Sequence, residues 1–208
     1  NNPRPIYFDI RFSNICNFKC KTCWHGNSSA WFEERSKKNA SNSRIIKAFT
    51  NNFNELFEYI DDVEEIYFAG GEPLIMEEHY QILEELEKRK LFNIQIRYNT
   101  NFSNLSFKNK DILKIWGKFK NVHISASIDA AFDLGEEIRE GFNWTEFIAN
   151  RKQMLLICPE IYFEITPTVS ILNVKNLPKL HQYLVTNKLL PIDNIYLNFL
   201  ERPSEYNI

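Results

Sequence analysis

The sequence has no long hydrophobic run, no excess of basic charge and no cysteines spread along the chain in pairs. Its longest unbroken apolar run, residues 154–158, is far too short to cross a membrane. No basic segment followed by an apolar one opens the chain as a signal peptide would. The 25 basic and 27 acidic residues give a net charge of −2, so the broad basic surface of a nucleic-acid-binding protein is not expected. These absences predict a cytoplasmic protein that binds neither membrane nor nucleic acid.

What the sequence does contain is the composition of a folded domain. Its 208 residues are 44% hydrophobic, 25% charged and 14% aromatic, which is typical of a globular protein and argues against disorder. A chain of this length can bury a core without disulfides, and it suits a single domain. Because the chain begins at Asn1 rather than Met, we expect a fragment or a processed product.

Strand-like and helix-like segments alternate along the chain. Six strands are predicted, at residues 6–12, 65–69, 93–98, 122–128, 161–169 (bent at Pro167) and 195–200. Five helices are predicted between them, at residues 44–59, 77–90, 108–116, 144–157 and 177–186. Residues 13–43 and the segment from residue 129 to residue 141 are expected to be loops. Regular alternation predicts an α/β fold with a parallel sheet and helices outside it, and leaves open whether the sheet curls into a partial barrel.

Three of the four cysteines lie within eight residues, just after the first predicted strand. Cys16, Cys20 and Cys23 form a C-x3-C-x2-C run, whereas Cys158 stands alone in an apolar run and is expected to be buried. A disulfide framework would spread its cysteines in pairs, so the cluster indicates a metal. Three thiolates can hold a [4Fe–4S] cluster and leave one iron open to a chelating ligand.

A structural zinc site is the alternative. Cys16, Cys20, Cys23 and His25 would offer a Cys₃His ligand set, although such sites usually contain ligand pairs separated by a longer stretch. Cys23 and His25 are also too close in sequence for both to ligate easily. This alternative predicts a zinc-stabilised α/β binding module without catalysis.

The cysteine run resembles the signature of the radical S-adenosylmethionine (SAM) enzymes, with Thr22 where that family has an aromatic residue. In that family the open iron binds the amino and carboxylate groups of SAM. Reductive cleavage of SAM then yields methionine and a 5′-deoxyadenosyl radical, which abstracts hydrogen from a substrate. The resemblance implies a partial (β/α)6 barrel similar to a TIM barrel. It also implies a [4Fe–4S] cluster, SAM and a low-potential electron donor such as flavodoxin or ferredoxin.

Further motifs resemble the same family. Gly70-Gly71-Glu72-Pro73 is similar to its GGEP motif, which binds the SAM amino group through backbone carbonyls and a carboxylate. Arg139 stands twelve residues after Ser127 of an S-x-D segment and would pair the SAM carboxylate. The resemblance implies that Cys16, Cys20 and Cys23 bind the metal cluster. It implies that SAM is contacted by Gly70, Gly71, Glu72, Pro73, Thr100, Asn101, Ser127, Asp129, Arg139 and Val169.

Five of these segments share a place in the predicted fold, since all fall at the carboxyl ends of predicted strands: Cys16–Cys23, Gly70–Pro73, Asn99–Asn101, Ser127–Asp129 and Thr168–Val169. Parallel α/β folds bind their ligands at that edge. Motifs scattered by chance would not share one edge, so this argument from topology is independent of the family resemblance.

The chain looks most like the branch of the family with C-terminal SPASM or twitch extensions, which hold auxiliary clusters. Residues 1–200 are expected to be the catalytic core, and residues 201–208 the start of a truncated extension, since no cysteine follows Cys158. The branch suggests a peptide or small-molecule substrate. A degenerate member that binds the cluster without turnover is a further alternative, suggested by Thr22 and by Phe102 in place of a glycine.

Overall fold

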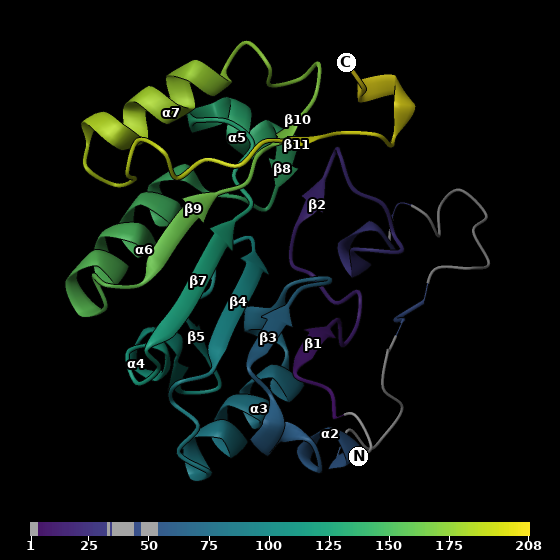
Figure 1. Cartoon of the computed structure of the whole chain (residues 1–208). Helices are drawn as coiled ribbons and strands as arrows, with labels where there is room; N and C mark the ends of the chain where they lie inside the picture. Colours follow the sequence, from purple (N-terminus) through teal and green to yellow (C-terminus); the bar gives the residue numbers. More distant parts are fainter. Residues whose placement is uncertain (1–3, 33, 35–43, 47–53) are drawn as a thin grey trace.

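A five-stranded parallel sheet forms the centre of the computed structural model, which describes residues 4–32, 34, 44–46 and 54–208 (Figure 1). In spatial order its strands are β1 (Tyr7–Ile10), β3 (Glu65–Phe68), β4 (Gln95–Thr100), β7 (Asn121–Ala126) and β9 (Tyr162–Ile165). All neighbours pair in parallel. Each strand lies beside the preceding one, as in a (β/α) barrel and unlike a doubly wound sheet, whose order reverses. The predicted α/β class is therefore confirmed.

The last two predicted strands are each broken in the middle. β9 ends at Ile165, and the chain resumes pairing in β10 (Thr168–Val169) with β11 (Asn198–Phe199), in parallel. Pro167 lies at the break and has no N–H to donate, which explains the predicted bend. A parallel bridge from Ile165 to Ile195 continues the sheet order to the sixth strand.

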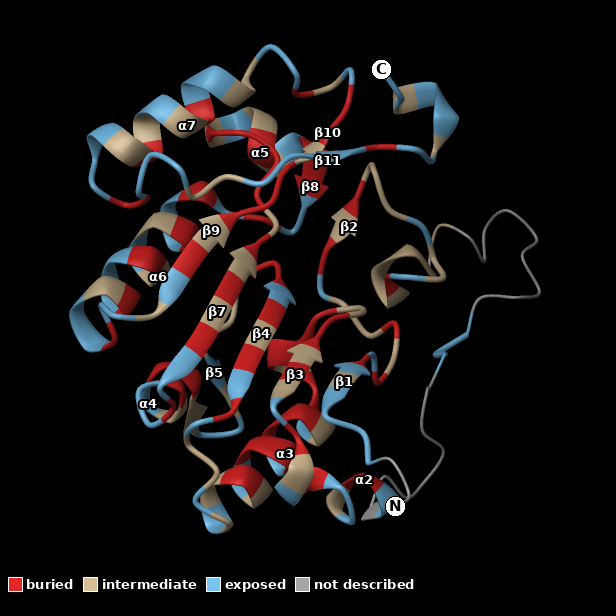
Figure 2. Cartoon of the chain, viewed as in Figure 1, coloured by how far each residue is buried: buried red, intermediate tan, exposed pale blue. Residues whose placement is uncertain are grey.

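Helices cover one face of the sheet. α3 (Glu77–Lys88), α4 (Ile112–Trp116), α6 (Trp144–Ile157) and α7 (Leu177–Thr186) correspond to predicted helices, and α6 and α7 have the predicted bounds. Alternate strand residues are buried against them (Figure 2): Phe68 contacts His79 of α3, and Tyr98 contacts Trp116 of α4. The intervening residues face the other, more polar side of the sheet, as period-two alternation requires.

The predicted helix at residues 44–59 is mostly wrong within the described residues. Arg44–Ile46 is not helical, because Ile46 exchanges hydrogen bonds with Asn14: its oxygen accepts from the Asn14 backbone (3.2 Å) and its N–H donates to Asn14 Oδ1 (2.9 Å). Helix α2 spans only Asn54–Phe57 and is followed by the 3₁₀ turn η2 (Ile60–Asp62). Residues 47–53 lie outside the described part of the chain.

Two predicted loops contain regular structure. The segment from residue 129 to residue 141 holds helix α5 (Phe132–Ile138) and strand β8 (Arg139–Glu140), and the cysteine loop holds β2 (Lys19–Cys20) and the 3₁₀ turn η1 (Ser29–Trp31). A hairpin of β5 (Ser106–Phe107) and β6 (Lys110–Asp111) occupies the predicted start of α4. These elements are too short to produce a hydrophobic period, so pattern alone does not reveal them.

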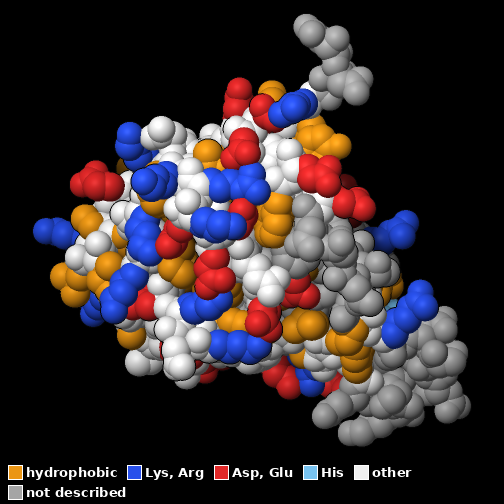
Figure 3. Space-filling model, turned by 90° about the horizontal axis from the view of Figure 1, so that it is seen from below, with side chains coloured by type: hydrophobic (Ala, Val, Ile, Leu, Met, Phe, Trp, Pro, Cys, Tyr) orange, Lys and Arg blue, Asp and Glu red, His pale blue; other side chains and the backbone are white. Residues whose placement is uncertain are grey.

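The surface is mixed in charge. Seen from below, Lys and Arg side chains alternate with Asp and Glu side chains rather than gathering in one large field (Figure 3), as the net charge of −2 suggests. The two remaining turns are η3 (Pro73–Ile75) and η4 (Ser204–Tyr206). Within the described ranges, no helix is long and apolar enough to cross a membrane.

Candidate functional site

The predicted site residues follow the carboxyl ends of the parallel strands. The cysteine loop follows β1, and the Gly70–Pro73 turn follows β3. Thr100 ends β4 and Asn101 follows it, and the segment with Ser127 and Asp129 follows β7. Val169 lies in β10, just beyond β9. Arg139 begins β8.

The three clustered cysteines are free thiols. Cys20 is buried, and Cys16 and Cys23 are half-buried. Burial raises the pKa of all three thiols, that of Cys20 to about 12, and the thiols are near enough to influence one another's pKa. Each thiol therefore keeps its proton at neutral pH until a metal displaces it.

The glycines after β3 allow the start of the cysteine loop to pack closely against the turn. Gly71 has φ +50°, and a Cβ added there would lie 2.2 Å from the backbone oxygen of Ile15. The same oxygen accepts a 2.8 Å hydrogen bond from the Glu72 N–H. Because Ile15 directly precedes Cys16, this close backbone contact fixes where the cysteine motif begins.

Glu72 ties the ends of β3 and β4 together. Its fully buried carboxylate accepts from Thr100 Oγ1 (2.6 Å), from the Asn101 N–H (2.6 Å) and from the Leu74 N–H (3.1 Å). Burial raises the pKa of the Glu72 carboxyl, and these three donors oppose that rise. The carboxylate is thus a structural anchor beneath the turn, and its side chain has no exposed surface.

A second link joins the β4 end to the cysteine loop. Asn101 donates from Nδ2 to Oδ1 of Asn17 (2.8 Å), and Asn17 donates from Nδ2 to Ser103 Oγ (3.0 Å). Asn17 lies between the first two cysteines of the motif. The sequence analysis did not identify this residue, and a polar residue at a variable position of a motif gives no signal for it.

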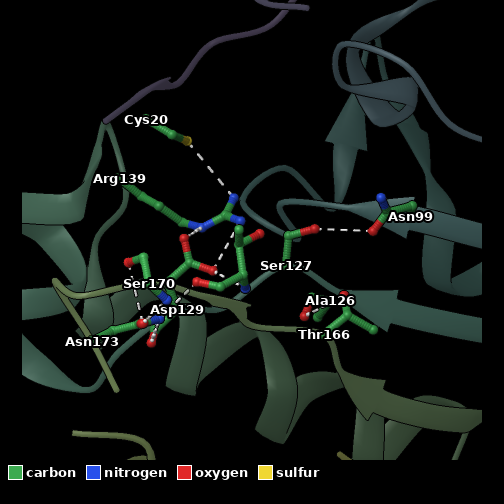
Figure 4. Close-up of polar contacts among 10 residues, drawn as sticks. Cys20, Asn99, Ala126, Ser127, Asp129, Arg139, Thr166, Ser170 and Asn173 are labelled. Carbon is green, nitrogen blue, oxygen red and sulfur yellow. Dashed lines mark hydrogen bonds and ion pairs between the residues drawn. The ribbon is translucent and has the colours of Figure 1, made fainter. Parts of the chain in front are cut away.

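Arg139 contacts both a cysteine and a buried carboxylate (Figure 4). Its Nε and Nη2 donate to Asp129 Oδ2 (2.8 Å) and Oδ1 (3.3 Å), and its Nη1 lies 3.7 Å from the Cys20 sulfur. Burial is the largest single effect on the pKa of Arg139 and lowers it, but Asp129, Cys20 and Cys23 together outweigh burial and raise the pKa. Antiparallel pairing of β2 with β8 sets Cys20 opposite Arg139 in register.

Asp129 also holds the start of β10. Its Oδ1 accepts from the Thr168 N–H (2.8 Å), and its backbone oxygen accepts from Asn173 Nδ2 (2.8 Å). Asn173 Nδ2 donates to the Thr168 oxygen as well (2.9 Å). One buried carboxylate therefore connects segments from β7, β8 and β10.

Ser127 and Val169 stand apart from this network. Ser127 is half-buried, its Oγ donates to Asn99 Oδ1 (3.0 Å), and its N–H donates to the Thr100 oxygen (2.8 Å). The Val169 side chain is buried. The structure thus brings Cys20, Asp129 and Arg139 into contact, but not Ser127 or Val169 with them.

The three cysteines offer the donor set of an iron–sulfur cluster. A tetrahedral zinc site needs its ligands to meet at one atom, whereas each cysteine of an iron–sulfur cluster binds a different iron. Three free, neighbouring thiols on one loop are the ligand set that a [4Fe–4S] cluster with one open iron needs.

The family comparison agrees with this chemistry. The model of the Radical SAM superfamily matches residues 10–176, so the chain belongs to that superfamily. The matched segment includes every predicted cluster and SAM residue, from Cys16 to Val169. Membership implies a [4Fe–4S] cluster and SAM as cofactors. No curated protein matches the chain by sequence.

Solved structures match in fold at low sequence identity. Streptococcus suis SuiB bound to precursor peptide SuiA superposes with a TM-score of 0.67 at 18% identity, covering 98% of this chain and 41% of SuiB. Native anSMEcpe with bound AdoMet gives a TM-score of 0.67 at 16% identity, covering 96% of this chain and 52% of that protein. The chain therefore spans about half of these proteins or less.

Proposed function

We propose that this chain is the catalytic core of a radical SAM enzyme, with Cys16, Cys20 and Cys23 binding a [4Fe–4S] cluster. When bound, the cluster supplies the electron that cleaves SAM to methionine and a 5′-deoxyadenosyl radical. The observation that carries the proposal is the buried contact of Arg139 with both Cys20 and Asp129. It sets a carboxylate-binding guanidinium beside a cluster ligand, which a plain zinc module would not need.

Arg139 has donors left for the SAM carboxylate. A guanidinium carries five N–H groups, and Asp129 and Cys20 accept from three of its atoms, Nε, Nη2 and Nη1. Two N–H groups remain for a second carboxylate, and paired donors suit that group. In this proposal Asp129 is a positioning residue that neutralises Arg139 and fixes its plane.

The other predicted residues would act in two ways. Gly70, Gly71 and Pro73 would let backbone carbonyls approach the SAM amino group, and Ser127 would contact the ribose and methionine region beside Val169 at the adenine pocket. Glu72, Thr100 and Asn101 are tied to one another, which supports a role in holding the strand ends that SAM lies across.

Relatives suggest a peptide substrate. SuiB is bound to a precursor peptide and anSMEcpe to peptides in solved structures, so we propose peptide modification for the whole protein. Residues 1–200 would form the core, and residues 201–208 would begin a C-terminal extension. A low-potential donor such as flavodoxin or ferredoxin would supply electrons in the cytoplasm, where thiols stay reduced.

The test is anaerobic turnover of SAM. The chain is reconstituted with iron and sulfide, reduced, supplied with SAM and assayed for 5′-deoxyadenosine. We expect product from the wild type and from Cys158→Ala, which lies outside the motif, and none from Cys20→Ala. Zinc instead of iron after native purification, with no product, would refute the proposal. Iron without product would identify a degenerate member.

A further inference from the structure

A cavity of about 520 Å³ opens at the other end of the sheet, remote from the cysteines. The residues around it come from the end of α6, the start of β9, the end of α7 and the loop at residues 188–194. These segments lie toward the amino ends of the strands, whereas the cysteine loop and the other predicted site segments lie at the carboxyl ends. A cavity of this size is typical of small-molecule sites.

One wall of the cavity is a buried arginine with an incomplete set of partners. Arg151 is 5% exposed, and its Nε donates to the Leu189 oxygen (2.8 Å). Its guanidinium carbon lies 4.1 Å from the centroid of the Phe163 ring, so the guanidinium is held against that ring. Within the described part of the chain, neither Nη atom has a hydrogen-bond acceptor or a carboxylate partner.

Arg139, the other buried arginine among the described residues, has the partner that Arg151 lacks. Arg139 is 8% exposed and has the Asp129 carboxylate on two of its nitrogens. Arg151 is also buried, yet no Asp or Glu lines its cavity. Burial lowers the pKa of Arg151 to about 10, the direction expected for a cation without a counter-charge. Its Nη atoms are not fully enclosed, so a ligand in the cavity can reach them.

The remaining walls set the rest of the ligand chemistry. Leu155, Ile161, Val185 and Leu190 contribute apolar surface, and Lys188 adds a second positive charge. An apolar pocket with a few convergent polar groups suits an amphipathic ligand, and a guanidinium with free Nη donors suits a carboxylate.

We propose that this cavity is a binding site for a small carboxylic acid with an apolar body, whose carboxylate is held by the Nη groups of Arg151. The site is separate from the proposed SAM site, and it does not depend on the cluster or on the activity proposed above. Its ligand would bind to the chain whether or not the cysteines carry iron.

The test compares a carboxylate with a neutral molecule of the same shape. Hexanoate and hexanamide are titrated into the whole chain, and binding is followed by the melting temperature and by the NMR signals of the Arg151 Nε–H and the Leu189 amide. We expect saturable binding of hexanoate, with hexanamide at least about tenfold weaker, because a charge-assisted pair is lost. Equal binding of the two, or no saturable binding of hexanoate, would overturn the proposal.

Matched variants remove one positive charge each from α6. Arg151→Met removes the proposed ligand-binding group and keeps an apolar stem, and Lys152→Met changes the next, exposed residue. We expect about a tenfold loss of hexanoate affinity in the first variant only. Equal losses in both would mean attraction by general charge and would contradict the site. Should Arg151→Met fail to fold, the hexanoate affinity of Arg151→Lys and the hexanoate–hexanamide comparison on the wild type still test whether the carboxylate binds at this site.

Discussion

At the residue scale, the site depends on positions where a side chain cannot be tolerated. Gly71 combines a φ of +50° with an approach that would set a Cβ 2.2 Å from the Ile15 oxygen. Neither the backbone angle nor the contact can relax without moving the start of the cysteine loop, because Glu72 is bonded to the same oxygen. The glycine is thus a packing requirement of the site, whatever it does for SAM.

We therefore predict that Gly71→Ala impairs iron binding more than overall folding. The variant should bind substantially less iron after reconstitution and should lose about 1–3 kcal/mol of unfolding free energy. Gly117→Ala is the control, since a Cβ there meets Leu113 oxygen at an ordinary 3.4 Å and φ is −61°. Iron content and urea unfolding measure both effects, and equal iron loading of the two variants would contradict the prediction.

At the scale of elements, short segments form the site, and short segments are the ones that the sequence pattern does not predict. Helices α6 and α7 could be predicted to the residue: α7 has a clear apolar face, and Pro159 limits α6, whose apolar residues show little helical periodicity. Strand β8 has two residues and exists only because it pairs with β2. No local pattern encodes that pairing, so Arg139 could be predicted as a carboxylate ligand but not as a neighbour of Cys20.

The same view explains the role of Asp129, which the sequence suggests as a SAM contact. In the structure this carboxylate joins elements, since it accepts from Arg139 and from the Thr168 N–H. Its neighbours are distant in sequence, so only the fold reveals the connection.

We predict that Asp129→Asn destabilises the joined elements strongly. An amide can still accept from Thr168, but it cannot neutralise the buried Arg139, and breaking a buried pair costs about 3–5 kcal/mol. Asp133→Asn, at an exposed position of α5, should change the unfolding free energy by less than about 0.5 kcal/mol. Chemical denaturation of both variants without metal measures the difference, and similar values for the two would show that the pair contributes little.

At the scale of the whole molecule, the core contains a buried polar pair that makes stability depend on pH. His79 of α3 lies among Phe68, Tyr80 and Tyr98, and its Nε2 is 2.7 Å from the Tyr98 hydroxyl. Burial, helped by the charge of Lys110, lowers the pKa of His79 to about 3 from its usual 6.5. Between these two pH values the imidazole is therefore neutral in the folded chain and charged in the unfolded chain.

The sign of the effect follows from proton counting. Between pH 6.5 and pH 3 the unfolded chain binds a proton at His79 and the folded chain does not, so the unfolding free energy falls as the pH falls through that window. Above about pH 6.5 this loss of unfolding free energy is absent, and over the whole window it amounts to about 5 kcal/mol.

We expect the His79 ring signals in NMR spectra of the folded chain to stay unchanged from pH 8 to pH 4. His79→Gln, which keeps a hydrogen-bonding group near Tyr98, should flatten the pH dependence of unfolding. His181→Gln, which alters a histidine bonded to the Ile192 oxygen on the surface, serves as the matched control. A His79 ring that titrates near pH 6 in the folded chain would show that the core admits the charge and that acid acts elsewhere.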